Sequence, residues 1–443
     1  MALTIQAQRG TQDVVPSQSY KWQFLEHITR EIALLHGLKE LRSPTFEATE
    51  LFCRSVGDTT DVVQKEMYTF LDKGARSITL KPEGTAGAVR NVLENGLLND
   101  ALPVKIFYQT PCFRYEKPDA GRLREFHQFG IEAFGSSSPS ADAEVICVAY
   151  DVFDTLGVEE LFLEINSIGC PECRPKFYQA LKDYFEKYKD KLCDTCLTRL
   201  DKNPMRILDC KSEICSEIAK DAPIVLDFLC DECKEHFEGV KKRLDAMNIP
   251  YAVNPTIVRG LDYYTKTVFE FVTNKKGSQG TICGGGRYDG LLELMGGKPT
   301  PALGFGMGFE RLLGVLENQG FEFPKPRNCE LFIGSIGDSA SIKALELTHA
   351  LRCEGFYVEC DTMGRSVKAQ MKYADKIGAR LSMIIGDSEL ETSSAEVKDM
   401  ESGESKKVCF GNGELQEYLY SIGLEAVTKD LEGKFATDLS NNI

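Results

Sequence analysis

The sequence predicts an α+β protein in which an antiparallel-sheet domain carries a mostly helical, Cys-rich insertion and is followed by an α/β domain. Three observations support this prediction. Two long extended segments flank the polar turn KPDAG at 117–121, as in an antiparallel hairpin. Between Cys170 and Ile249, Gly becomes rare and charged helical segments alternate with Cys pairs. After the Pro-containing stretch at 324–328, strands alternate with helices, which is typical of an α/β domain.

The elements of the first domain follow from periodicity and from turn residues. Apolar residues at helical spacing predict a helix over 19–36, and Pro44 interrupts the extended run that comes next. We expect a second helix over 85–96 and the hairpin over 104–134. Gly-rich extended sequence returns at 256–309, so the first domain should resume there. The predicted boundaries are 1–169 and 250–325 for the first domain, 170–249 for the insertion, 326–424 for the α/β domain and 425–443 for a polar tail.

Length and composition restrict the class of protein. The chain has 443 residues, of which 42% are hydrophobic and 27% charged, as in an ordinary globular protein of several domains. The net charge of −15 means that nucleic acid could bind only through local basic surfaces. The N-terminus lacks the apolar core of a signal peptide, and no apolar run in the sequence is long enough to span a membrane. We therefore expect a cytosolic protein with no membrane partner.

One face of the predicted hairpin suits a small polar ligand. Side chains alternate along a strand, so Gln128, Gly130 and Glu132 share a face. Arg114, at the end of the matching face of the outgoing strand, offers a fixed fork for a phosphate, and Glu132 offers a charge for an ammonium group. The basic loop between the strands includes Arg122 and is expected near a polyanion. An ordinary sheet with one face in water explains the same pattern.

The segment KPEGTAG at 81–87 combines a carboxylate with a helix start. Thr85 can cap the helix that follows, whose free backbone N–H groups then point at whatever lies before it. Glu83 just ahead can hold a cationic group. A plain Pro-Gly turn followed by a capped helix explains the segment equally well.

Two later segments also set an arginine beside glycines. Arg259 is expected at a strand start next to Gly260, ahead of the Gly-rich stretch at 280–290, on whose backbone a ligand can lie. Arg311 falls in the first turn of a helix after alternate glycines at 304–308. Neither a GK[ST] phosphate loop nor a GxGxxG motif opening a βαβ unit is present. With the hairpin arginine, these two suggest guanidinium groups that hold a triphosphate.

The order of these segments resembles the class II aminoacyl-tRNA synthetases, and within them the histidyl-tRNA synthetase family. RSPTFE at 42–47 is similar to the first class II motif, which builds the dimer interface in the family. FRYE with GRLREFHQFGIEAFG resembles the second motif, and GFGMGFERLL resembles the third. RGLDYYTKTVFEF and GGGRYDG resemble the two signatures peculiar to the histidine enzymes. The resemblance covers nearly the whole chain and implies a class II synthetase catalytic domain followed by an anticodon-binding domain.

The resemblance also implies roles for individual residues. The residues that would hold histidine are Glu83, Gly84, Thr85, Gln128, Glu132, Arg259, Tyr263 and Tyr264, with the two tyrosines lining the imidazole pocket. Arg114, Glu116 and Arg311 would bind ATP. The catalytic residues would be Arg259, Arg114 and Gln128, with both arginines at the α-phosphate.

The implied activity is the ligation of histidine to tRNA. ATP with Mg²⁺ would activate L-histidine to histidyl-adenylate and pyrophosphate, and histidine would then pass to the 3′ end of tRNA(His), in a cytoplasmic homodimer. Joining a carboxylate to a phosphate brings two anions together, so the site must supply positive charge but needs no general acid or base. The alternative is the non-catalytic regulatory subunit of ATP phosphoribosyltransferase, which shares the fold but generally lacks the anticodon domain and the full histidine signatures.

The last domain offers a surface for tRNA. Lys368, Lys372, Lys376 and Arg380 recur every four residues, and Arg365 precedes them by one turn. On a helix they would form one basic stripe, and the resemblance places anticodon recognition in this domain. With Arg122 of the hairpin loop, the three lysines are our candidates for tRNA contact, although a merely solvated face is the alternative reading.

Cysteine usage predicts metal binding in the insertion. The chain has 16 cysteines, and disulfides are a poor explanation for a cluster of them in a cytosolic protein. Four pairs lie in the insertion: Cys170/Cys173, Cys193/Cys196, Cys210/Cys215 and Cys230/Cys233. Three pairs have the C-x2-C spacing of zinc ligands.

Several occupants fit these pairs. Eight thiolates would complete two tetrahedral zinc sites of four cysteines each, or one site if the wider C-x4-C pair is only structural. An iron–sulfur cluster is chemically compatible with the same ligands, and free thiols in a small helical subdomain are a further alternative. We expect structural zinc, whose loss should weaken tRNA charging and leave histidine activation largely intact.

Overall fold

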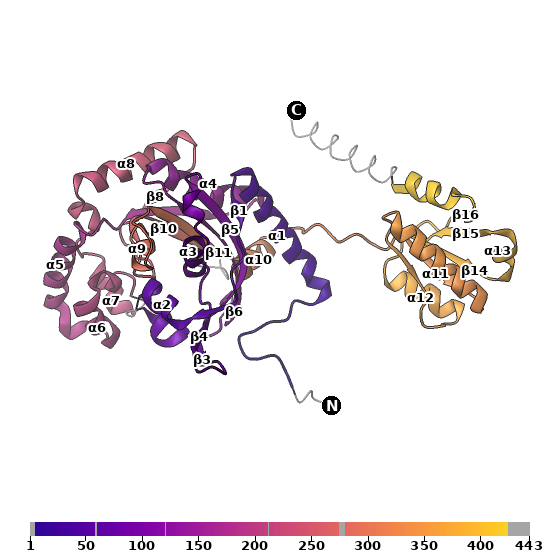
Figure 1. Ribbon diagram of the computed structural model, residues 1–443, viewed down its shortest axis with the longest axis horizontal. Coiled ribbons are helices and arrows are strands. Elements are labelled where there is room, and N and C mark those ends of the chain that lie inside the picture. The colour runs from indigo at the N-terminus through magenta and orange to yellow at the C-terminus, as the bar shows by residue number, and fades with distance from the viewer. Residues whose placement is uncertain (1–4, 58–59, 120, 211, 274–279, 424–443) are drawn as a thin grey trace. The chain divides into compact units, whose positions relative to one another are not determined.

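The structure is a computed structural model that describes residues 5–57, 60–119, 121–210, 212–273 and 280–423 (Figure 1). The chain divides into two compact units, Met1–Pro324 and Lys325–Ile443. The division falls at the start of the Pro-containing stretch singled out in the sequence, and the expected tail at 425–443 lies outside the described residues.

The first unit is organised around an eight-stranded sheet with the order β1-β5-β6-β11-β10-β9-β7-β8. All neighbouring strands are antiparallel except the pairs β1·β5 and β7·β8 at the two edges. The strands are β1 Lys39–Glu40, β5 Val104–Phe113, β6 Glu125–Phe134, β7 Leu161–Ser167, β8 Ala252–Val253, β9 Thr265–Thr273, β10 Gly280–Arg287 and β11 Ala302–Gly308. A separate three-stranded sheet contains β2 Phe46–Ala48, β3 Tyr68–Leu71 and β4 Ser77–Leu80.

The two faces of the large sheet differ in kind. Phe107, Phe129 and Phe305 lie on the apolar face and pack in one hydrophobic core against three helices, α1 (Pro16–Leu35), α4 (Pro139–Thr155) and α10 (Phe309–Asn318). The opposite face carries Tyr108 and Glu132, which are 3% and 0% exposed. The polar face is therefore not an ordinary water-facing surface. The other α-helices of this unit outside the insertion are α2 Thr49–Val56, α3 Thr85–Glu94 and α9 Leu291–Leu294, with a short π-helix at Val62–Glu66 and a short 3₁₀-helix at Leu97–Asn99.

The insertion is helical but does not form a separate unit. Its Phe177 and Cys233 belong to the same hydrophobic core as Tyr264, Val268 and Tyr288 around the sheet. In Figure 1, α5, α6 and α7 gather beside the sheet and α8 runs back toward α4. The helices are α5 Arg174–Phe185, α6 Asp194–Lys202, α7 Glu213–Ala219 and α8 Asp231–Ala246, with 3₁₀ segments at Glu186–Lys191, Pro204–Ile207 and Val225–Phe228.

The second unit has a five-stranded sheet with the order β13-β12-β14-β15-β16. Strands β13, β12 and β14 pair in parallel, whereas the pairs β14·β15 and β15·β16 are antiparallel. The predicted α/β character of this unit is confirmed. The elements are β12 Leu331–Ser335, α11 Asp338–Cys353, β13 Val358–Cys360, α12 Val367–Lys376, β14 Leu381–Ile385, α13 Asp387–Thr392, β15 Ser394–Asp399 and β16 Ser405–Cys409, and a last helix occupies 414–423.

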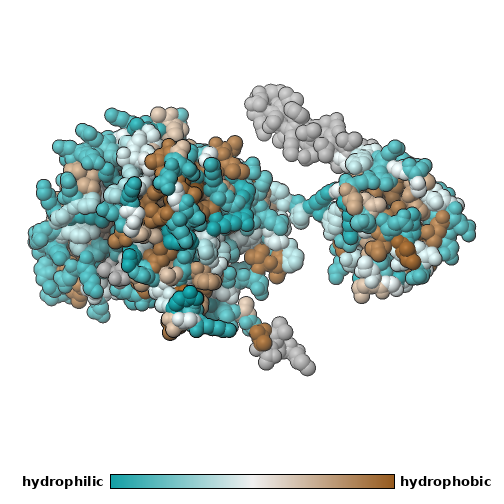
Figure 2. All heavy atoms as spheres, viewed as in Figure 1, coloured by the Kyte–Doolittle hydropathy of each residue, from teal (hydrophilic) through white to brown (hydrophobic). Residues whose placement is uncertain are grey.

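The surface seen in Figure 2 is mainly hydrophilic, with scattered hydrophobic groups on both units. Among the described residues, no helix combines the length and the apolar character that crossing a membrane requires.

Candidate active site

A cavity of about 290 Å³ lies on the polar face of the large sheet. It is lined by residues from the start of α3, from β6, from the loop between β5 and β6, from the segment before β9 and from α10. The residues singled out in the sequence that line it are Glu83, Thr85, Arg114, Glu116, Arg122, Gln128, Arg259, Tyr263, Tyr264 and Arg311. Gly84 and Glu132 are not among its lining residues.

The start of α3 differs from the sequence expectation, which gave the cap to Thr85. Gly84 is the N-cap residue, and the carboxylate of Glu83 accepts hydrogen bonds from the backbone N–H groups of Thr85 (2.8 Å) and Ala86 (2.7 Å). Burial raises the pKa of Glu83, and these N–H groups oppose the shift. A carboxylate has about four acceptor positions, so Glu83 can still accept a hydrogen bond from a ligand.

Tyr108 fills the space that Gly84 and Gly130 leave open. A Cβ added to either glycine would overlap the Tyr108 ring. The Tyr108 hydroxyl donates to Oε1 of Glu132 at 2.9 Å, and the Tyr288 hydroxyl donates to the other oxygen. We expected Glu132 to offer its charge to a ligand on this face. In the structure Glu132 is fully buried, bonds two tyrosines and is not among the lining residues of the cavity.

The buried position of Glu132 gives a pH prediction. Burial raises its pKa from an ordinary 4.5 to about 8. Between these values the unfolded chain binds fewer protons than the folded protein, so the free energy of unfolding falls as the pH rises. Glu132→Gln should remove this slope, which amounts to at most about 3 kcal/mol between pH 5.5 and 8 because each pKa unit is worth about 1.4 kcal/mol. Urea denaturation at both pH values measures it.

A matched control for this measurement is Glu125→Gln on the same strand, since Glu125 is only partly buried. That variant should keep the pH dependence of the unmodified protein. An unchanged slope in Glu132→Gln would show that Glu132 is ionised in the folded protein across this range.

Arg259 lies in an irregular segment before β9, and not at a strand start as expected. Its guanidinium forms an ion pair with Glu270 and lies 5.7 Å from the centre of the Tyr264 ring. Burial alone would lower the pKa of Arg259, but Glu270 and Tyr264 together outweigh burial and the pKa is raised. A Cβ at Gly284 would lie 2.5 Å from Nη1 of Arg259, so this glycine makes room for the arginine. Arg259 is therefore a permanent, held cation.

The other two arginines are held in different ways. Arg114 donates from Nε to the Pro82 carbonyl at 2.8 Å and lies 5.3 Å from the centre of the Phe126 ring. Arg311 donates to the carbonyl of Thr281, and burial together with nearby Arg122 lowers its pKa. Both guanidinium groups line the cavity.

Four side chains at or next to the cavity were not singled out from the sequence: Tyr108, Glu270, Tyr288 and Glu310. Glu310 lines the cavity, and its carboxylate accepts the backbone N–H of His127 at 2.9 Å. Glu270 also accepts from the Thr281 hydroxyl at 2.7 Å. β9 pairs with the Gly-rich strand β10, and Glu270 lies opposite Gly284 in this pairing. A lone glutamate within the otherwise apolar run VFEFV, next to the Gly-rich segment, was the sequence feature that could have indicated Glu270.

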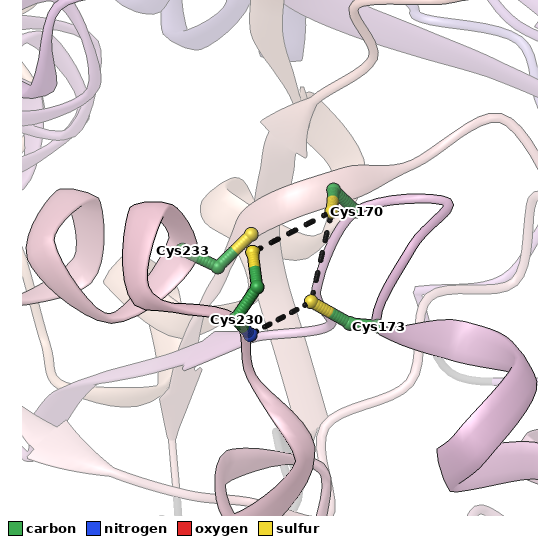
Figure 3. Close-up of side chains that lie close together, drawn as sticks. All are labelled: Cys170, Cys173, Cys230 and Cys233. Carbon is green, nitrogen blue, oxygen red and sulfur yellow. Dashed lines mark hydrogen bonds between the residues drawn. The ribbon is translucent and has the colours of Figure 1, made fainter.

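The eight insertion cysteines form two groups of four, of which Figure 3 shows the one that contains Cys170 and Cys230. The first cluster contains Cys170, Cys173, Cys230 and Cys233, and the second cluster contains Cys193, Cys196, Cys210 and Cys215. Within each cluster all sulfurs lie within 4.8 Å of one another. The wider C-x4-C pair thus belongs to a complete set of four, and either cluster could hold a metal ion.

The basic stripe is shorter than the sequence suggested. Lys368, Lys372 and Lys376 are exposed along α12. Arg380 lies beyond the helix end, after Gly378 with its φ of +66°, and Arg365 pairs with Asp361 at 2.8 Å. The stripe therefore consists of three lysines.

Comparisons with known proteins agree with this geometry. A family model described as histidyl-tRNA synthetase matches residues 10–312, and one described as anticodon binding domain matches 330–414. The chain is 58% identical over 410 residues to a histidine–tRNA ligase of Clostridium novyi, covering 93% of this chain and 98% of the relative. The apo histidyl-tRNA synthetase of S. aureus is similar with a TM-score of 0.79 and 40% identity, covering 94% of this chain and 99% of that structure. A Bacillus halodurans structure titled ATP phosphoribosyltransferase regulatory subunit/histidyl-tRNA synthetase shares the fold, with a TM-score of 0.62 and 20% identity over 87% of this chain and 99% of its own.

Proposed function

Because the chain belongs to the histidyl-tRNA synthetase family, we propose that it is a histidine–tRNA ligase, which activates L-histidine with ATP and transfers it to tRNA(His). The observation that carries the proposal is the single cavity lined by Arg114, Arg259 and Arg311 together with Glu83, Gln128 and the tyrosine pair. Three guanidinium groups suit a triphosphate, and the carboxylate, amide and phenol groups suit a small zwitterion.

The chemistry follows from charge. The histidine carboxylate attacks the α-phosphate of ATP, and pyrophosphate leaves. Arg259 and Arg114 stabilise the negative charge that gathers at this phosphate, and Arg311 holds the far end of the triphosphate. The carboxylate oxygens of Glu116 and Glu310 in the same cavity fit Mg²⁺, which when bound neutralises phosphate charge. No side chain has to transfer a proton in this step, because the attacking carboxylate is already ionised.

The test is histidine-dependent exchange of pyrophosphate into ATP by the full chain. Exchange with histidine, none without it, and formation of histidyl-tRNA on addition of tRNA(His) are the expected results. The alternative, a regulatory subunit of ATP phosphoribosyltransferase, predicts a folded protein without exchange. The 58% identity to a ligase and the matched anticodon-binding domain favour the enzyme.

For tRNA, we place part of the contact on Lys368, Lys372 and Lys376 of α12. Replacing all three with Ser should raise the KM for tRNA about tenfold. It should also reduce the slope of log K for tRNA binding against log salt concentration by up to about three, because each lysine–phosphate contact releases roughly one counterion. Exchange without tRNA should not change, because these lysines lie in the other unit. Equal salt slopes for the variant and the unmodified protein would remove the stripe from the interface. Arg122, which lies 3.3 Å from Glu116 beside the cavity, is placed near the tRNA 3′ end.

The proposed enzyme is a homodimer that acts in the cytoplasm, where its substrates are found, and its insertion holds structural zinc. Phe46, Phe70 and Leu71 on the small sheet are 54%, 47% and 67% exposed, which suits an interface between two copies. Sedimentation of the full chain should give twice the mass of 49.4 kDa.

A further inference from the structure

Residues 259–266, here named the arginine–tyrosine segment, carry Arg259, Tyr263 and Tyr264 and are bonded to residues near both cysteine clusters. We propose that each cluster binds one zinc ion through its four cysteines and that each zinc ion fixes one end of this segment, so that zinc positions the histidine pocket. The inference rests on the proposed function and adds to it a dependence of the first reaction on two metal ions outside the cavity.

The spacing of the sulfurs fits zinc. Four sulfurs at a Zn–S distance of about 2.3 Å lie about 3.8 Å apart at the corners of a tetrahedron. In the first cluster, Cys170 Sγ lies 3.6 Å from Cys173 Sγ and 3.9 Å from Cys230 Sγ. In the second, Cys193 Sγ lies 3.8 Å from Cys210 Sγ. These distances are too long for a disulfide, whose sulfurs lie about 2 Å apart.

The backbone around the sulfurs suits thiolates. Cys173 Sγ accepts the Cys230 N–H at 3.1 Å, and Cys215 Sγ accepts the Cys193 N–H at 3.3 Å (Figure 3 shows the first of these). Cys230 and Cys193 are the N-cap residues of α8 and α6, and the positive ends of these helices favour negative sulfur. Zinc suits these cysteines better than an iron–sulfur centre does. None of the eight cysteines lines the cavity, and the proposed reaction has no electron transfer.

The first cluster holds the C-terminal end of the arginine–tyrosine segment through residues that adjoin its cysteines. Arg174, next to Cys173, donates to the backbone carbonyl of Tyr264. The Gly169 carbonyl, next to Cys170, accepts the Thr265 hydroxyl at 3.1 Å and the Lys266 N–H at 3.0 Å.

Lys266 supplies a second link to the first cluster. Its Nζ donates to Glu232, between Cys230 and Cys233, at 2.6 Å. Its φ of +50° is a left-handed conformation that a non-glycine residue keeps only where its surroundings impose it.

The second cluster holds the other end. Asn203 and Arg206 lie on the chain between Cys196 and Cys210. Arg206 donates to the Gly260 carbonyl at 2.6 Å, directly after Arg259, and Asn203 donates to Asp262 at 3.2 Å. The backbone on both sides of the catalytic arginine and the two tyrosines is thus bonded to residues that zinc would hold in place.

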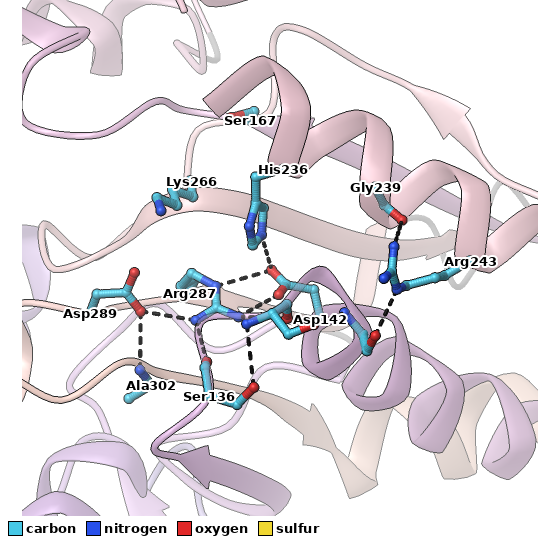
Figure 4. A network of polar contacts seen from close by, with 12 residues as sticks. Ser136, Asp142, Ser167, His236, Gly239, Arg243, Lys266, Arg287, Asp289 and Ala302 are labelled. Carbon is cyan, nitrogen blue, oxygen red and sulfur yellow. Dashed lines mark hydrogen bonds and ion pairs between the residues drawn. The ribbon is translucent and has the colours of Figure 1, made fainter. Parts of the chain in front are cut away.

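A metal-independent anchor keeps the rest of the insertion attached. His236 on α8 lies 3.2 Å from Asp142 of α4, and Asp142 forms a buried ion pair with Arg287 of β10 (Figure 4). Arg287 also lies 3.1 Å from Asp289. Loss of zinc should therefore loosen the chain around the cysteines without releasing α8 from the rest of the unit. Variants of the cysteine ligands should then stay folded, so their kinetics can be measured. From the sequence we expected histidine activation to stay largely intact without the metal. The hydrogen bonds to the arginine–tyrosine segment lead us to expect instead that activation weakens.

The first measurement is metal content by mass spectrometry of the full chain purified without chelator. About two zinc ions per chain are expected, and about one in each of Cys170→Ser/Cys173→Ser and Cys193→Ser/Cys196→Ser. The matched control is Cys353→Ser/Cys409→Ser, which removes two thiols of the other unit and should keep both ions. Less than one zinc per chain, or iron with sulfide in its place, overturns the site.

The second measurement is the kinetics of histidine-dependent pyrophosphate exchange. A misplacement of about 1 Å can cost up to a hundredfold, so we expect changes of at least about tenfold. The first ligand variant should raise the KM for histidine, because it frees the Tyr264 end. The second should mainly lower kcat, because it frees the Arg259 end. The KM for ATP should stay within about twofold in both, since Arg114 and Arg311 lie outside the segment.

Two contact variants separate positioning from general loosening. Arg174→Met and Arg206→Met remove the hydrogen bonds to Tyr264 and Gly260 but leave all eight cysteines. Both should keep two zinc ions. Arg174→Met should raise the KM for histidine as the first ligand variant does, and Arg206→Met should lower kcat as the second does. Unchanged kinetics in all four variants, although each ligand variant has lost one zinc ion and each contact variant has kept both, overturns positioning. An unmodified chain that binds zinc but performs no exchange contradicts the proposed function instead, so the two failures are distinguishable.

Discussion

Arg259→His should lower the rate of histidyl-adenylate formation by about 10² or more, the loss typical when one fixed donor to transition-state charge is removed. Arg259 is held by Glu270 and lies in the space that Gly284 leaves open, so its guanidinium is fixed before the substrates bind. Histidine binding should weaken much less, because the charge at the α-phosphate builds up mainly in the transition state. Single-turnover formation of adenylate and equilibrium binding of histidine measure the two effects.

Two controls accompany this variant. Arg259→Lys keeps the charge without the planar guanidinium. Its rate of adenylate formation should lie between those of the unmodified protein and Arg259→His. Thermal unfolding of Arg259→His reports whether leaving Glu270 without its partner has disturbed the fold. If binding and rate fall equally in a folded protein, Arg259 acts on the ground state and the assignment is wrong.

Histidine analogues that lack one ring nitrogen should be activated with kcat/KM reduced by about 10³ or more, because a site that hydrogen-bonds a polar group leaves its own groups unpaired when that group is missing. Glu83 and Tyr264, which line the cavity, are the predicted partners of the two nitrogens. The burial of both side chains raises the cost of leaving them unpaired. Pyrophosphate exchange with each analogue measures the discrimination.

Tyr264→Phe is the matched variant for this prediction. Removing the hydroxyl should cost about tenfold in kcat/KM for histidine, the range expected for one buried hydrogen bond, and should reduce the discrimination against one of the analogues. The backbone carbonyl of Tyr264 remains available to Arg174, so the segment should keep its position. If histidine is activated with unchanged kinetics, the hydroxyl is not a ligand of the ring.

The fold class and the family could be predicted from sequence because both rest on local patterns. The hairpin was expected over 104–134, and β5 and β6 occupy Val104–Phe113 and Glu125–Phe134. The comparisons confirm the predicted family and fold class. The first helix begins at Pro16, earlier than expected, because proline is favoured in the first turn of a helix, where its missing N–H is not needed.

The features that could not be predicted are of two kinds. One is local: the Glu83 side chain folds back onto the N–H groups of Thr85 and Ala86, which the rules for cap residues do not foresee. The other kind depends on partners far apart in sequence. Glu132 was expected at the ligand, but it is not among the lining residues of the cavity, and the Tyr288 hydroxyl that bonds it lies 156 residues away. The pairing of the cysteines had the same difficulty, since the first pair along the chain joins the last.

The Tyr108 ring between Gly84 and Gly130 has a consequence for how this enzyme can evolve. An alanine at either glycine would overlap the ring, so each substitution should be harmful in the present background. Both should become acceptable once residue 108 has a small side chain. The three positions are therefore epistatic, and mutational drift can pass through them only in one order, with the tyrosine changing first. Since losing Tyr108 also removes a hydroxyl from Glu132, that first step carries its own penalty, and selection should keep all three residues together.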